Sequence, residues 1–194
     1  AATILVGCAM AATPALADDP APADAGKSMP AFTVTGNVSL VTDYRFRGVS
    51  LSGGDPAIQG GITLTHSSGL YVGTWSSSLS PSPVYGTQEL DLFGGWTGEV
   101  SSGLTLDAGL LYYVYPGGHV GDANYWEPYA SISGLLGPAK LKLGVAYDWS
   151  QKGLIDNAGN HSDNLYIYTN LAVGVPGTPL TISGHLGYTD GVLS

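Results

Sequence analysis

The sequence predicts an all-β protein, an antiparallel up-and-down transmembrane β-barrel, and three observations support this. Apolar and polar residues alternate with a period of two through most of the chain after residue 31, which is the pattern of a strand with two different faces. Formal charges fall on only one of these faces. The connections alternate between short and long, as in outer-membrane barrels with short periplasmic turns and long extracellular loops.

The composition agrees with a protein that exposes much of its surface to lipid. Of the 194 residues, 11% are charged, whereas soluble domains carry about 25%. The mean hydropathy is +0.15. The net charge of −9, with six Lys and Arg residues in all, provides no basic surface for phosphate groups and excludes nucleic acid as a partner.

The first residues, AATILVGCAMAATPALADDP, predict export from the cytoplasm. Residues 1–17 resemble a signal peptide that lacks its N-terminal start, with cleavage after Ala17. An alternative is lipidation at Cys8 in the stretch LVGC. The following acidic, proline-rich residues 18–31 predict a disordered periplasmic tail. Cys8 is the only cysteine, so no disulfide within the chain is possible, and no later apolar run is long enough for a transmembrane helix.

The first strand of the predicted barrel lies in residues 32–47, FTVTGNVSLVTDYRFR. One parity is apolar and includes Tyr44 and Phe46, and the other ends in Asp43, Arg45 and Arg47. In a soluble sandwich these faces would meet a second sheet and water, whereas in an outer-membrane barrel they would meet lipid and a wet lumen. The second interpretation places Asp43, Arg45 and Arg47 in the lumen or at its rim.

The remaining strands follow from the same periodicity and from the turn residues between them. About nine strands are predicted in all, over residues 32–46, 57–66, 70–77, 87–97, 103–115, 124–134, 139–149, 164–174 and 179–189. The short connections are 67–69, 98–103, 135–138 and 175–179. The long ones, 48–56, 77–86, 116–124 and 150–164, are rich in Gly, Pro, Ser, Asp and Asn, as loops require. Residues 32–194 thus form the predicted barrel domain.

Charged residues on the inward parity are the candidate site residues. In the predicted topology Ala31 is periplasmic and the long loops, including Asn157, are extracellular. The candidates for the lumen and its constriction then lie in the outer half: Asp43, Arg45, Arg47, Glu89, Asp91, Glu127 and Asp148. Lys140 and Lys142 lie in the lumen at the periplasmic end. Because acids outnumber arginines in the outer half, we expect a weak preference for cations.

The sequence predicts no enzyme, no cofactor and no metal site. None of the four histidines accompanies a serine in a nucleophile-elbow pattern, and the glycine-rich stretches are turns and not phosphate loops. HVGD at 119–122 and DNAGNHSD at 156–163 hold carboxylates and histidines that could bind a metal. We interpret both as turn sequences, because Asp, Asn and Gly make turns.

Five stretches taken in order carry a family resemblance: GNVSLVTDYRFRGVS, PAIQGGITLTHSSGLYVGTWSSS, ELDLFGGWTGE, LDAGLLYYVYPGG and YWEPYAS. They resemble the TorF-type porin family, also known as the Gcw_chp family, of Gram-negative bacteria, over roughly residues 32–191. The resemblance implies a signal-peptide-bearing outer-membrane β-barrel, and it brings no substrate and no catalytic residue. It also implies a chain that continues past Ser194, with about twelve strands in the full barrel, since bacterial single-chain barrels have even counts.

The predicted function is therefore an outer-membrane porin that allows passive diffusion of small polar solutes or ions. Its partners would be outer-membrane lipid and those solutes. The alternative is a structural or adhesive barrel with a blocked lumen, whose extracellular loops bind a partner. The alternation pattern is the same for an open and a filled lumen, so it leaves both functions open.

Overall fold

The period-two segments form long antiparallel strands in the computed structural model, which describes residues 3–7, 30–156 and 158–193. Nine strands follow one another along the chain: β2 (Phe32–Val41), β5 (Ala57–His66), β6 (Leu70–Ser82), β7 (Gly86–Ser101), β8 (Leu104–Val114), β9 (Tyr125–Leu136), β10 (Ala139–Asp148), β11 (Asn164–Gly174) and β12 (Thr181–Gly191). Two short strands, β3 (Arg45–Phe46) and β4 (Val49–Ser50), pair only with each other. The described residues contain no helix.

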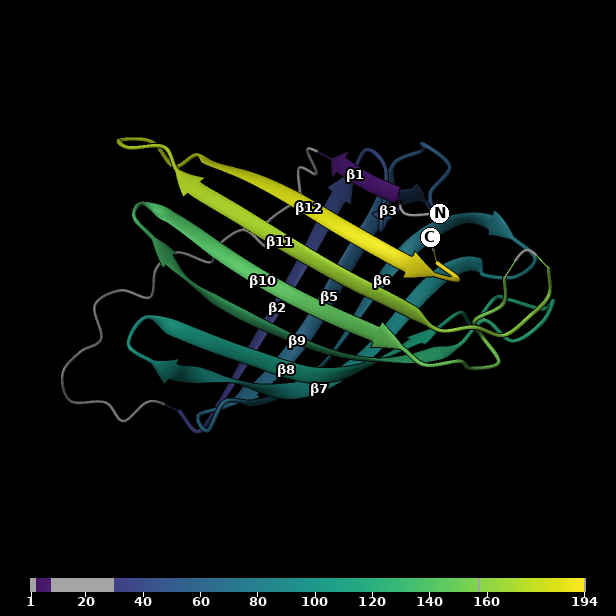
Figure 1. Cartoon of the computed structure of the whole chain (residues 1–194), viewed down its shortest axis with the longest axis horizontal. Helices are drawn as coiled ribbons and strands as arrows, with labels where there is room; N and C mark the ends of the chain where they lie inside the picture. Colours follow the sequence, from purple (N-terminus) through teal and green to yellow (C-terminus); the bar gives the residue numbers. More distant parts are fainter. Residues whose placement is uncertain (1–2, 8–29, 157, 194) are drawn as a thin grey trace.

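The nine strands form one curled sheet in which each strand pairs with its neighbours in the sequence (Figure 1). The sheet begins at β2 and ends at β12, where the short strand β1 (Thr3–Gly7) adds a tenth strand. The two edges, β2 and β1, do not pair with each other. The fold is thus an antiparallel half-barrel with an inner and an outer face. Among the described residues there is no helix of the length and hydropathy needed to cross a membrane.

The two faces differ as the sequence pattern predicts, and β10 shows this most clearly. Leu143, Val145 and Tyr147 are 49, 40 and 42% exposed on the outer face. On the other parity, Ala146 and Asp148 are buried on the inner face, at 5 and 0%. Apolar side chains are therefore exposed on the outside while a carboxylate is buried on the inside, the reverse of a soluble domain with a water-facing exterior.

The connections lie at two ends of the half-barrel, which we call the turn end and the loop end. Residues 67–69, 102–103, 137–138 and 175–180 connect strands at the turn end, on the left and lower left of Figure 1. Gly103 and Gly137 take positive φ angles of 71° and 61° in the two-residue turns, a conformation that glycine adopts without steric cost. The connections 42–56, 83–85, 115–124 and 149–163 lie at the loop end.

The predicted first strand, 32–46, is too long, because the structure ends β2 at Val41. Beyond this point the chain leaves the sheet and folds into the β3–β4 hairpin. Tyr44 and Phe46, predicted on the lipid-facing parity, instead pack against the buried residues of the interior. The prediction was wrong here because inward contacts, which no local period reveals, determine the path of these residues.

The predicted loop 77–86 is also wrong in length, because β6 and β7 extend through most of it and leave only residues 83–85 between them. A register shift between Ser78 and Ser82 accommodates the extra residues, as β-bulges do. At the turn end β7 likewise runs to Ser101, with a second register shift after Glu99. The prediction failed because proline and serine are typical of loops, whereas here they lie in the part of β6 that extends beyond the neighbouring strands.

The predicted N-terminal segments are only partly described. Residues 3–7 of the predicted signal peptide form β1, which pairs with β12 from Thr3↔Thr189 to Gly7↔His185. Cys8, the cleavage position at Ala17 and residues 18–29 of the predicted tail lie outside the described residues, as does Asn157.

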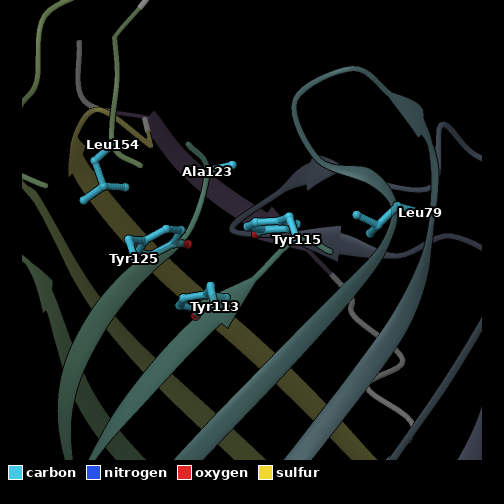
Figure 2. Close-up of a cluster of buried hydrophobic side chains, with 6 residues drawn as sticks. All are labelled: Leu79, Tyr113, Tyr115, Ala123, Tyr125 and Leu154. Atoms are coloured by element: carbon cyan, nitrogen blue, oxygen red, sulfur yellow. The ribbon is translucent and has the colours of Figure 1, made fainter. Parts of the chain in front are cut away.

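The interior is filled at the loop end by an aromatic cluster. Figure 2 shows its six buried members on the ends of the strands and the adjoining loops: Leu79, Tyr113, Tyr115, Ala123, Tyr125 and Leu154. The rings of Tyr113 and Tyr125 stack at 4.4 Å between centroids. This cluster is the hydrophobic core of the described chain, and it lies inside the curl of the sheet at one end.

Candidate functional site in the polar interior

The connection after β2 folds inward as a hairpin, residues 43–52, which we call the inner hairpin. The N–H of Leu51 donates to the carbonyl of Tyr44 at 2.8 Å, and the N–H of Tyr44 donates to Ser52 Oγ at 2.9 Å. The N–H of Ser80 donates to the carbonyl of Leu51 at 2.9 Å, which ties the hairpin to β6. Its conformation is therefore fixed both internally and to the wall of the half-barrel.

Arg47 anchors this hairpin to the opposite wall. Its side chain is 3% exposed and forms ion pairs with Glu127 on β9 and, at 3.1 Å, with Asp148 on β10. The guanidinium carbon lies 4.6 Å from the centre of the Tyr166 ring on β11, a cation–π distance. Arg47 is also the described non-glycine residue with a positive φ, 47°. A backbone in this region is strained, so the anchoring contacts compensate a local cost.

The environment of Arg47 keeps it charged. Burial, the largest single influence on its pKa, acts to lower it, but Glu127, the tyrosines Tyr113 and Tyr125, and Asp148 act to raise it, and the pKa lies above its ordinary value. A guanidinium that is buried and ionised needs carboxylate partners, because an unpaired buried charge is very unfavourable. The network therefore joins a charged loop residue to acidic side chains on two strands.

Glu89 and Asp91, both on β7, form with Glu127 and Asp148 a group of buried acids that we call the acidic cluster. The Tyr44 hydroxyl donates to Glu89 Oε1 at 3.0 Å. Burial raises the pKa of Tyr44 well above its ordinary value, and the Glu89 carboxylate raises it further, so Tyr44 remains a hydrogen-bond donor. Within the described chain, Glu89 Oε2, Asp91 Oδ1 and Asp148 Oδ1 are buried and accept no hydrogen bond.

The loop end of the interior thus holds more acidic than basic side chains. Four carboxylates, those of Glu89, Asp91, Glu127 and Asp148, are at most 6% exposed, and Arg47 is the cation among them. The field of these groups acts in a poorly hydrated space, where charge interactions are stronger than in water.

Asp43 and Arg45, the other two outer-half candidates, lie away from this cluster. Their side chains form an ion pair of 2.6 Å, with 60% of Arg45 exposed. Ser50 Oγ donates to Asp43 Oδ1 at 2.5 Å, and this hydrogen bond is the main cause of the lowered pKa of Asp43. The pair stabilises the shape of the inner hairpin and contributes nothing to the buried charge.

Lys140 and Lys142 lie at the turn end of β10, on the inner face. Lys142 Nζ is 3.8 Å from Asp107 Oδ2 on β8. Both lysines and Asp107 line a cavity of about 470 Å³ together with serine and threonine side chains from β7, β8 and β9. The turn end of the interior therefore holds two lysines with Asp107, whereas the loop end holds the four buried acids with Arg47.

Inward-facing tyrosines are functional candidates that the sequence reasoning missed. The Tyr113 hydroxyl donates to Glu127 Oε1 at 3.0 Å, and the Tyr71 hydroxyl donates to Asp107 Oδ1 and contacts the Tyr129 hydroxyl, each at 2.5 Å. The signal was present, because Tyr113 shares the parity of Asp107 on its strand. The sequence-based prediction used only the charged residues of the inward parity and so did not include the tyrosines beside them.

Tyrosine also fills space at Gly144, which lies on the inner face of β10. A Cβ at Gly144 would lie 2.2 Å from the ring of Tyr168 on β11, its registered neighbour. A Cβ at Gly109 would lie 2.5 Å from the Tyr129 hydroxyl in the same way. The rings lie across the glycines of the adjacent strand, so these inner-face positions have no free space.

The four histidines are distributed over the molecule. His66 Nδ1 contacts Ser68 Oγ at 2.8 Å in an exposed turn, and His161 Nδ1 contacts the Gln151 carbonyl at 3.0 Å in a loop. His185 on β12 bridges the Tyr166 hydroxyl and the Asn170 side chain, each at 2.6 Å. His119 lies in the loop 115–124. In the part of the chain that the structure describes, no three His, Cys, Asp or Glu side chains converge on a metal position.

Comparison with known families places the chain. Residues 24–194 match the model of a family described as "Bacterial protein of unknown function (Gcw_chp)". The chain belongs to this family. The matched region contains all the strands from β2 to β12 and every residue of the polar interior. No curated protein matches the chain.

Proposed function

We propose that this Gcw_chp-family protein is an outer-membrane β-barrel that works as a porin for small polar solutes or ions. The observation that carries the proposal is that the outer face of the sheet is apolar and exposed while its inner face is polar and largely buried. Large apolar side chains are exposed along the outer face of every long strand, for example Val38 at 80% and Ile182 at 70%. Contact with lipid would stabilise such a face, because the transfer of an exposed apolar side chain from water to lipid is favourable.

The polar interior supports passage of hydrophilic solutes. Charged and hydroxyl side chains line the inner face from the lysines at the turn end to the acidic cluster at the loop end. The buried carboxylates favour a weak preference for cations, because rings of acidic side chains attract cations in a narrow pore. The matched family is described as of unknown function, so the porin activity is proposed from the two faces and the polar interior alone. Catalysis is not part of it.

One feature favours the alternative, a structural or adhesive barrel with a blocked lumen. The inner hairpin and the aromatic cluster together occupy the loop end of the interior, and Arg47 fixes the hairpin to the far wall. A barrel closed in this way would use its loops, and not its lumen, for contacts outside the cell. The two functions differ in one measurable property, which is ion flow.

Single-channel conductance of the full-length protein, refolded in planar bilayers, tests the proposal. We expect discrete conductance steps and, in a salt gradient, a reversal potential of cation-preferring sign. No current under any condition would refute the porin function and leave the blocked barrel.

Selectivity is tested in the same bilayers with the double variant Glu89→Gln and Asp91→Asn, which should weaken the cation preference. A matched control is Glu99→Gln, since Glu99 is an exposed carboxylate at the turn end whose Oε1 accepts from the N–H of Gly103. An unchanged reversal potential in the double variant would show that the acidic cluster does not determine selectivity.

A further inference from the structure

The inner face near the turn end presents a grid of polar side chains across three strands. In the register of the sheet, Ser133 on β9 lies opposite both Lys142 on β10 and Thr105 on β8. One row further along, Ser131 lies opposite Asp107. Neighbouring strands are about 4.8 Å apart, so each side chain in a row is within reach of the next. The grid is a surface of regularly spaced hydrogen-bonding groups.

This grid forms the wall of the cavity of about 470 Å³ at the turn end. Cavities of roughly 300–1,000 Å³ hold small-molecule ligands, and the volume is far larger than a simple inorganic ion requires. Within the part of the chain that the structure describes, the hydroxyls of Thr105 and Ser133 have no hydrogen-bond partner. They are therefore free to donate to and accept from a solute that carries hydroxyl groups.

The charges around the cavity favour an anionic group on that solute. Lys142 forms an ion pair of 3.8 Å with Asp107. Lys140, also in the wall of the cavity, forms no ion pair with a described residue. Asp107 already accepts from the Tyr71 hydroxyl, which leaves its other oxygen for Lys142 or for a solute hydroxyl. Glu99, the nearest further acid on β7, is occupied by the backbone of its own turn.

We propose that this cavity is a binding subsite for a small polyhydroxylated anion of the sugar-acid class. Lys140 and Lys142 bind the carboxylate of the solute, and the side chains of Thr105, Ser131, Ser133 and Asp107 bind its hydroxyl groups. The inference goes beyond the proposed function, because it adds an anion-binding subsite at the lysine end of an interior whose loop end is acidic. Binding at the turn end does not require passage through the inner hairpin, so the two proposals can fail separately.

Equilibrium dialysis of the full-length protein in non-ionic detergent, with radiolabelled glucuronate, tests the subsite. Glucose, which has the hydroxyls without the charge, and acetate, which has the charge without the hydroxyls, are the comparison probes. We expect glucuronate to be retained at least tenfold more strongly than either. The double variant Lys140→Gln with Lys142→Gln should lose at least tenfold in affinity, and Thr105→Val with Ser133→Ala several-fold.

The control variant is Lys152→Gln, which removes a lysine from the exposed loop 149–163 at the other end and should bind glucuronate as the unaltered protein does. Equal retention of glucuronate and acetate, no retention of glucuronate, or full binding by the double lysine variant would each overturn the subsite. Glucuronate binding without any channel current would support the subsite and refute the porin. Channel current without glucuronate binding would support the porin and refute the subsite.

Discussion

Replacing Arg47 with Met should destabilise the protein more than any other single change in the inner hairpin. Arg47 is 3% exposed, and its two partners, Glu127 and Asp148, are 8 and 0% exposed at the side chain. Removing one partner of a buried ion pair costs about 3–5 kcal/mol, because the remaining charge stays buried without compensation. Here two carboxylates lose the same partner. We therefore expect a loss near about 4 kcal/mol in the free energy of unfolding.

Urea unfolding of the protein refolded in phospholipid vesicles, followed by tryptophan fluorescence, measures this loss. With a denaturant slope of about 2 kcal/mol per M, a loss of about 4 kcal/mol lowers the unfolding midpoint by about 2 M. Arg45→Met is the matched control, since Arg45 lies two residues away and its ion pair with Asp43 is largely exposed. This control should shift the midpoint little, because exposed pairs contribute little to stability.

Two further variants separate the ion-pair effect from a general defect in packing. Arg47→Lys keeps the charge but lacks the planar fork that reaches both carboxylates, so its loss should be smaller than that of Arg47→Met. Adding Glu127→Gln to Arg47→Met removes one of the unpaired charges and should recover part of the stability. If Arg47→Met and Arg45→Met shift the midpoint equally, the reasoning from burial is refuted.

The remaining predictions concern the membrane, the topology and the loops. Leu143→Arg on the outer face should cost about 2–4 kcal/mol in the vesicle titration and Thr105→Arg on the inner face much less; equal penalties would contradict a lipid-facing exterior. On whole cells, a membrane-impermeant thiol reagent should label a cysteine introduced at Gly159 but not one at Gly137, and the opposite result would invert the topology. Hydrogen bonds from backbone N–H groups of its own turn lower the pKa of Asp156. Its contribution to loop stability should therefore be present above the ordinary pKa of an aspartate and be lost as the pH falls through the lowered value, and a carbon-13 NMR titration showing an ordinary pKa would contradict this.

The sequence by itself determined the strands and their faces. A period of two is a property of the extended backbone, so the outward direction of Leu143 and the inward direction of Asp148 could be predicted residue by residue, and the structure places both accordingly. The glycine turns at the turn end could be predicted for the same reason, because turn chemistry is local. The same alternation predicted that Glu89, Asp91, Glu127 and Asp148 face the interior, and the structure buries all four.

Only the tertiary structure decided what the interior contains. The path of the inner hairpin depends on partners 80 and 101 residues away from Arg47 in the sequence, and local patterning carries no information about such contacts. Tyr44 reads as a lipid-facing residue in its own segment, yet it donates to Glu89 across the interior. The filling of the space at Gly144 by the Tyr168 ring likewise depends on the register between two strands. Alternation specifies which face a side chain occupies, whereas the curl of the sheet determines which side chains meet inside it.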